Sequence, residues 1–239
     1  MPDLTNNLFF YYLSVLLDTR SFVGQSPQLF GLLQKNAPAC RLESLVGKNT
    51  DICIESPSGS ANSYFVNGFQ MVNPEVRVAH HHHVAAQVTM GVRLRVPTVV
   101  LLRDPVDCVV SRAAFMNSPI LIGPIFRQWI RFFRAAEQVR DKILIVSFES
   151  VTKQPEEVIR AINVRFGTSF NSKFPGIEQI SARMDRRYAQ VTGKSEQRNP
   201  NLPSTDKEAF KSRIRPFVME HRLARPACDL YSRLVGAEI

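Results

Sequence analysis

The chain has 239 residues, of which 44% are hydrophobic and 21% are charged, with 15 prolines and 11 glycines. This composition is typical of a globular protein, and it excludes a collagen-like chain, a coiled coil and a disordered protein. Lys and Arg outnumber Asp and Glu by 30 to 21, and the net charge of +9 favours an anionic partner such as a nucleotide, an acidic glycan or a nucleic acid.

Apolar periodicity and turn residues predict the secondary-structure elements in chain order. The predicted helices cover residues 5–19, 27–35, 64–71, 84–95, 105–115, 124–140, 154–167 and 205–234. The predicted strands cover residues 51–55, 76–79, 98–102 and 142–147. The strands are continuous apolar runs that alternate with helices, which predicts an α/β three-layer sandwich with a parallel sheet. Residues 183–203 show little periodicity, and we expect the last helix to break at Pro216.

The longest apolar stretch, Leu8 to Leu17, is too short for a membrane span. It has about half of the ~20 residues that a span needs. No basic region precedes it and no small-residue cleavage site follows it, so we interpret it as a core-facing helix rather than a signal peptide. None of the four cysteines belongs to a CxxC pair, which favours a reduced, cytoplasmic protein.

The first predicted strand is followed by a loop of small residues, SPSGSANS, over residues 56–63. Small residues let the backbone approach a ligand closely, and the N–H groups at the start of a helix favour an anion. Ser60 and Ser63 add hydroxyl donors. These residues fit a phosphate or sulfate site and a plain strand-to-helix turn equally well. The loop lacks the Gly-Lys-Ser/Thr ending of a Walker A motif, which counts against an ATPase or a nucleotide kinase.

A second group of polar residues follows the third predicted strand. Arg103 comes directly after that strand, and Ser111 lies about two turns along the next helix. Ligands of an open parallel sheet bind at the carboxyl ends of its strands. A guanidinium and a hydroxyl at that edge can converge on one phosphate. In the alternative interpretation, Arg103 pairs locally with Asp104 or Asp107.

Together these two segments resemble the PAPS-dependent sulfotransferase family, which has a P-loop-like nucleotide-binding fold. Residues 58–65, SGSANSYF, are similar to the family's Pro-Gly-Ser-Gly-Asn-Thr-Trp-Leu variant. Arg103-Asp104-Pro105 with Ser111 matches the family's Arg-[Asp/Asn]-Pro motif, in which a Ser follows the Arg by eight residues. Residues 142–149, a strand followed by Phe-Glu, resemble a third family element. The resemblance spans roughly residues 50–215.

The resemblance implies transfer of a sulfuryl group from 3′-phosphoadenosine 5′-phosphosulfate (PAPS) to a hydroxyl or amine acceptor, with 3′-phosphoadenosine 5′-phosphate (PAP) as the product. It implies that the first loop holds the 5′-phosphosulfate and the second motif holds the 3′-phosphate. The expected nucleotide-binding residues are Gly59, Ser60, Ala61, Asn62, Ser63, Tyr64, Arg103, Ser111, Lys194 and Arg198. Lys194 and Arg198 stand in for the basic residue that many members carry in the first loop, where this chain has Ser58 or Gly59.

Four consecutive histidines, residues 80–83, follow the second predicted strand. On an extended chain His81 and His83 would share one face. A solvated or structural cluster and a metal site are both open, although a metal needs a third ligand and none is obvious nearby. Many members of the family carry a His at the end of the corresponding strand, which favours a catalytic base. We expect His83, then His81, in that role, and no metal.

We expect one sulfotransferase-like domain over residues 1–239, with a nucleotide-binding core at about 50–170 and a C-terminal helical segment at about 183–239. The acceptor is a small molecule or a glycan of unknown identity. Nucleic acid is not expected, because the basic residues are not interleaved with exposed aromatic residues in any recognised nucleic-acid-binding motif. The basic strip Arg127, Arg131 and Arg134 fits a solvated face or an acceptor-binding surface. The alternatives are an inactive nucleotide- or glycan-binding protein on the same fold, and a phosphotransferase, which would need a metal and a phosphate-binding Lys.

Overall fold

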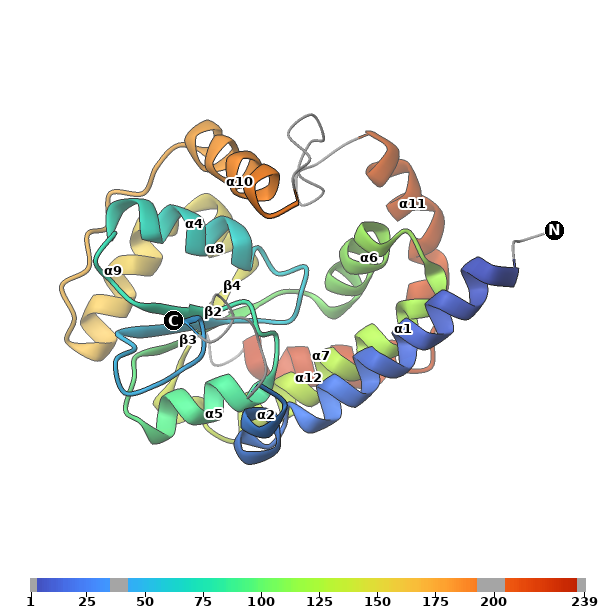
Figure 1. Cartoon of the computed structure of the whole chain (residues 1–239), viewed down its shortest axis with the longest axis horizontal. Helices are drawn as coiled ribbons and strands as arrows, with labels where there is room; N and C mark the ends of the chain where they lie inside the picture. The colour runs from blue at the N-terminus through green and yellow to red at the C-terminus, as the bar shows by residue number, and fades with distance from the viewer. Residues whose placement is uncertain (1–3, 35–42, 193–204, 236–239) are drawn as a thin grey trace.

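The computed structural model describes residues 4–34, 43–192 and 205–235 (Figure 1). At its centre is a sheet of four strands, all parallel, in the order β2-β1-β3-β4. The strands are β1 (Ile52–Glu55), β2 (Val78–His80), β3 (Thr98–Leu102) and β4 (Leu144–Ser147). Each lies where the sequence predicts a strand, and the parallel α/β fold is confirmed.

Helices connect the strands and continue after the last one. They are α1 (Leu4–Val23), α2 (Pro27–Gln34), α4 (Asn62–Val72), α5 (Ala85–Arg93), α6 (Pro105–Met116), α7 (Ile122–Glu137), α8 (Phe148–Lys153), α9 (Pro155–Phe166), α10 (Ile177–Thr192), α11 (Thr205–Met219) and α12 (Ala224–Val235). Two short 3₁₀ turns, η1 (Pro119–Leu121) and η2 (Arg140–Lys142), flank α7. Among the described helices, none combines the length and the hydrophobicity that crossing a bilayer requires.

Both faces of the sheet are covered by other elements. Successive side chains of each strand point to opposite sides of the sheet, so each strand contributes to two cores. On β3, Val99 and Leu101 belong to a core that includes apolar residues of α4 and α9. Val100 and Leu102 belong to the opposite core, which includes residues of α5, α6, α7 and α12 and the fully buried Trp129. Figure 1 shows α4 and α9 on one side of the sheet and α5, α7 and α12 on the other. The predicted three-layer arrangement is therefore confirmed.

The long helix α1 is attached to α7 through its single acidic residue. The guanidinium of Arg127 binds both carboxylate oxygens of Asp18, and its Nε lies 2.7 Å from Oδ1. Arg131 Nη1 donates to Asp18 Oδ1 at 3.2 Å and to Ser21 Oγ at 2.6 Å. Two of the three arginines of the basic strip are thus occupied by an ion pair between helices, which corrects the expectation of a solvated or acceptor-binding strip for them.

Two predictions for the C-terminal part are wrong. Residues 183–192 belong to helix α10, in which Ile180 and Met184 are buried against α4 on one side. Pro216 lies inside α11, and the chain breaks instead over residues 220–223. Ile214 and Val218 are both buried against α6, and this packing on either side of Pro216 offsets the hydrogen bond that the proline removes.

Candidate active site at the carboxyl edge of the sheet

The loop between β1 and α4 leads directly into the first turn of a helix. Gly59 has φ +100° and Ala61 has φ +62°, so two residues of this short loop are left-handed. Ala61 is the N-cap of α4 and offers no side-chain acceptor. The N–H groups of the first helical turn therefore keep their capacity to bind an anion.

Arg103 stands at the end of β3 and faces this loop. Its Nη1 donates to the carbonyl oxygen of Gly59 at 2.6 Å, and its guanidinium lies 4.0 Å from the ring centre of Phe148. Its buried Nε has no partner, so one donor remains available. The local pairing considered as an alternative does not occur, because Asp104 caps α6 and Asp107 pairs with Arg215.

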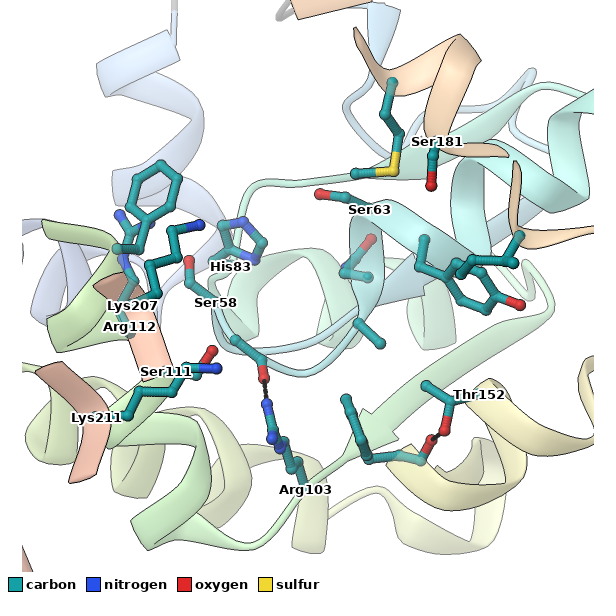
Figure 2. Close-up of a pocket in the computed structure, with 18 residues that line it drawn as sticks. Ser58, Ser63, His83, Arg103, Ser111, Arg112, Thr152, Ser181, Lys207 and Lys211 are labelled. Atoms are coloured by element: carbon teal, nitrogen blue, oxygen red, sulfur yellow. Dashed lines mark hydrogen bonds between the residues drawn. The ribbon is translucent and has the colours of Figure 1, made fainter. Parts of the chain in front are cut away.

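A cavity of about 380 Å³ opens between the loop and the helices around it. Its walls come from the β1–α4 loop, α4, α6, α8, α10 and α11 (Figure 2). The lining residues are Ser58, Gly59, Ala61, Asn62, Ser63, Tyr64, His83, Arg103, Ser111, Arg112, Phe115, Phe148, Thr152, Ile177, Ser181, Met184, Lys207 and Lys211. Four of these described lining residues are Lys or Arg and none is acidic.

Eight of the residues expected from the sequence line this one cavity. They are Gly59, Ala61, Asn62, Ser63, Tyr64, His83, Arg103 and Ser111. Ser60 does not: it is fully buried, with its Oγ 3.6 Å from the Sγ of Cys108 on α6. His81 does not line the cavity either, but it contacts a residue that does: its Nε2 lies 2.9 Å from the Oγ of Ser63. Lys194 and Arg198 lie outside the described residues.

Three cations of the cavity were not predicted. Arg112 follows Ser111 on α6 and is directed over the ring of Phe115, 4.9 Å from its centre. Burial, the largest influence, lowers the pKa of Arg112. Lys207 and Lys211 are one helical turn apart on α11, which packs against α6, and Lys211 forms an ion pair with Glu208 at 2.7 Å. Their spacing of four residues marks one helix face, but only tertiary packing places that face opposite Ser111.

The histidine run forms a tight turn rather than an extended strand. Strand β2 ends at His80, and His81 and His83 have φ values of +62° and +54°. The fully buried carboxylate of Glu55 holds this turn: Oε1 accepts the backbone N–H of His82 at 2.8 Å, and Oε2 accepts that of His83 at 2.9 Å. The expected extended backbone is therefore wrong. The turn nevertheless places the rings of His81 and His83 side by side, with their centres 5.8 Å apart and edge to face.

The ring of His83 has a defined tautomer. Its Nδ1 lies 2.7 Å from the carbonyl oxygen of Ser56, which can only accept, so Nδ1 carries the hydrogen. Nε2 is then left with a lone pair on a ring that lines the cavity (Figure 2). Burial, followed by the positive charge of neighbouring groups, lowers the pKa of His83 to about 3 and that of His81 to about 4. Both rings are neutral at physiological pH.

The metal interpretation of the histidine run gains no support. Among residues 4–34, 43–192 and 205–235, no group of three His, Cys, Asp or Glu side chains is arranged to hold a metal ion. The rings of His80 and His81 are in contact through their Nδ1 atoms, while Nε2 of His81 is engaged with Ser63.

Comparison with known proteins gives little more. No protein-family model matches the chain, and no curated protein matches it. A solved structure that is similar is the crystal structure of mouse sulfotransferase SULT7A1 complexed with PAP, at 11% sequence identity and a TM-score of 0.43. The match covers 83% of this chain and 95% of that one. A similarity at this level does not carry over a site or an activity to this chain.

Proposed function

We propose that this protein is a sulfotransferase that moves a sulfuryl group from PAPS to a hydroxyl or amine of a small-molecule or glycan acceptor. The observation that carries the proposal is the composition of the cavity. Four cationic side chains, the open first turn of α4 and a neutral imidazole line one cavity at the carboxyl edge of a parallel sheet, without an acidic residue among the described lining residues. Such a site selects a ligand that is anionic at more than one point.

The residues present fit a nucleotide with phosphate groups at two positions. The unpartnered Nε of Arg103 can donate to a 3′-phosphate, and Ser111 adds a hydroxyl. The N–H groups at the start of α4, with Ser63, suit the oxygens of a 5′-phosphosulfate. The aromatic residues Tyr64, Phe115 and Phe148 offer apolar contact to a base and a ribose. A volume of about 380 Å³ is within the range of small-molecule sites.

In this proposal, His83 is the general base. PAPS, when bound, supplies the electrophilic sulfuryl group. The acceptor oxygen or nitrogen forms a bond to sulfur, the bond from sulfur to the 5′-phosphate oxygen breaks, and the acceptor proton passes to His83 Nε2. The Ser56 carbonyl fixes the ring for this task, since it holds the hydrogen on Nδ1. The pKa of about 3 keeps Nε2 unprotonated at working pH, although it makes the ring a weak base in the resting site.

Positive charge at the reacting centre has to come from outside the first loop. Ser58 and Gly59 stand where many sulfotransferases have a basic residue. We assign this role to Arg112, Lys207 and Lys211, whose side chains line the same cavity. Lys194 and Arg198, which are expected from the sequence to serve the same role, lie outside the described residues.

The domain assignment and the location belong to the same proposal. We infer one sulfotransferase-like domain over residues 1–239, because α11 and α12 pack against α6 and α7 of the nucleotide-binding core and α11 contributes two of the cavity's cations. We infer a cytoplasmic location from the three described cysteines, Cys53, Cys108 and Cys228, all of which are free thiols.

Calorimetric titration with PAP, with AMP and ATP as controls, tests the nucleotide site. We expect PAP to bind at least tenfold more tightly than AMP, and Arg103→Ala to remove that preference. Arg233→Ala is the matched control, because Arg233 pairs with Glu137 at an exposed site outside the lining of the cavity. Equal binding of ATP and PAP, or an unaffected Arg103→Ala variant, would overturn the assignment.

Turnover then separates an enzyme from an inactive binding protein. Transfer of ³⁵S from labelled PAPS is measured against a panel of phenols, alcohols, amines and glycans. Turnover that is lost in Arg103→Ala supports the sulfotransferase. Tight and specific PAP binding with no transfer to any acceptor class would favour the inactive nucleotide-binding alternative.

A further inference from the structure

The outer face of α1 is mostly apolar, with Thr19 as the exposed polar residue among residues 8–22. Of its described side chains, seven large apolar ones are more than 40% exposed: Leu8, Phe9, Tyr11, Tyr12, Val15, Leu16 and Phe22. At 100° per residue these positions fall within a single arc of the helix. The opposite side, with Phe10, Leu13 and Leu17, packs against the core beside α7. We call the seven exposed residues the α1 face.

The α1 face carries no charge. The two charged residues of α1, Asp18 and Arg20, are both turned towards the protein's own core: Asp18 binds Arg127 and Arg131, and Arg20 donates to the carbonyl oxygen of His82 at 3.1 Å. A helix that lies on a membrane surface usually presents Lys and Arg beside its apolar face, and α1 does not. An acidic or basic partner would likewise find no complementary charge here.

The size of the α1 face matches one half of a protein interface. Its four aromatic side chains are each about 60% exposed, which leaves about 500 Å² of aromatic surface in water. Its three aliphatic residues bring the face towards the roughly 800 Å² per partner of a standard interface. Monomeric proteins rarely expose a continuous apolar patch of more than a few hundred Å². In Figure 1, α1 runs along the outer edge of the molecule, where a second helix can approach it.

We propose that α1 is the interface of a homodimer, in which two α1 helices pack antiparallel about a two-fold axis at Val15. The two ends of the α1 face are equally spaced about that residue. Leu8 and Phe22 are seven residues before and after it, so Leu8 of one copy faces Phe22 of the other. Val15, the smallest side chain of the face, lets the two helix axes approach at the crossing point.

Sedimentation velocity of the full chain over a wide concentration range tests the proposal. We expect a species of twice the 27.1 kDa chain mass that Val15→Glu converts to monomer. Val164→Glu is the control, because Val164 is an apolar residue of α9 that is 87% exposed and far from α1 in the sequence. Unchanged far-UV circular dichroism and melting temperature of Val15→Glu establish that the variant is folded.

Cross-linking tests the two-fold axis separately. Val15→Cys should form an intermolecular disulfide under mild oxidation, whereas Leu8→Cys should not, because Leu8 is far from its own symmetry mate. The unsubstituted chain serves as the blank for its native thiols. A monomeric parent protein, a dimer that survives Val15→Glu, or equal cross-linking of both cysteine variants would overturn the proposal. Vesicle flotation gives one more refuting outcome. A monomer that floats with phosphatidylcholine–phosphatidylserine vesicles, and that no longer does so in Val15→Glu, would also overturn the proposal.

Discussion

The fully buried carboxyl group of Glu55 supports the histidine turn, and we expect it to titrate near neutral pH. Burial, the largest influence, raises its pKa from 4.5 to about 7, although the N–H groups of His82, His83 and Ser56 act in the opposite direction. In the unfolded chain the same carboxyl has its ordinary pKa. Between these two values the folded protein keeps a proton that the unfolded chain has released. The free energy of unfolding therefore falls as the pH rises from about 4.5 to about 7.

The magnitude follows from the size of the shift. Each unit of pKa difference corresponds to about 1.4 kcal/mol, so the whole shift from 4.5 to about 7 corresponds to about 3.5 kcal/mol. This stability is fully present below the unfolded pKa and is lost once the pH has risen through the folded one. The buried histidines oppose the trend: the pKa values of His81 and His83 are lowered by burial, so their contribution is lost as the pH falls below about 6.5.

Glu55→Gln separates the two effects, because the histidines are present in both proteins. The variant keeps one acceptor for the turn and places an amide group against the other N–H. Urea unfolding of both proteins at pH 5, 6, 7 and 8 gives the difference in unfolding free energy at each pH. We expect that difference to change by about 3 kcal/mol across the range, in the direction that favours the variant at high pH. A difference that stays constant would refute the reasoning about burial.

Two further predictions concern the base and the packing of α4. His83→Gln should leave the PAP affinity within twofold and lower turnover by about 10²–10⁴-fold. In the parent enzyme, protonation of His83 should not limit turnover between pH 5 and 8, because its pKa is lowered to about 3. The assignment fails if His81→Ala abolishes turnover while His83→Gln does not. Gly68→Ala should lower the unfolding free energy, because a Cβ there would lie 2.1 Å from the ring of Phe174. Its control Gly31→Ala, in a helix with open space around it, should raise stability by about 0.5–1 kcal/mol.

The central sheet could be predicted from the sequence because its strands are apolar on both faces. Strand β3 occupies residues 98–102, as predicted, because TVVLL is a short run of β-branched and apolar residues directly after Pro97. Helix α10 (Ile177–Thr192) was not predicted, because its apolar signal is sparse: of its residues 177–190 only Ile180 and Met184 are buried, and most of the others are polar or charged. The strength of the signal depends on how many faces of an element are buried.

The candidate site also contains some residues whose positions the sequence could predict and others whose positions it could not. Arg103 and Ser111 could be brought together from the sequence, because both belong to one strand-helix unit whose geometry is fixed. Lys207 and Lys211 could not, since their position depends on how α11 packs against α6. The turn at His81 and His83 was also out of reach, because the left-handed backbone is held by the distant carboxylate of Glu55. Local spacing indicates local geometry and says nothing about contacts between remote segments.

The structure also explains why the first loop has no basic residue at position 59. A Cβ on Gly59 would lie 2.9 Å from the carbonyl oxygen of Cys108, and its φ of +100° disfavours any L side chain. Lys or Arg at this position would displace the start of α6. Ser58 lines the cavity without a left-handed backbone. We therefore expect Ser58→Arg to tighten PAP binding and Gly59→Arg to unfold at lower urea concentration without tightening it. Tighter binding by the folded Gly59→Arg variant would show that the close approach of α6 does not exclude a cation there.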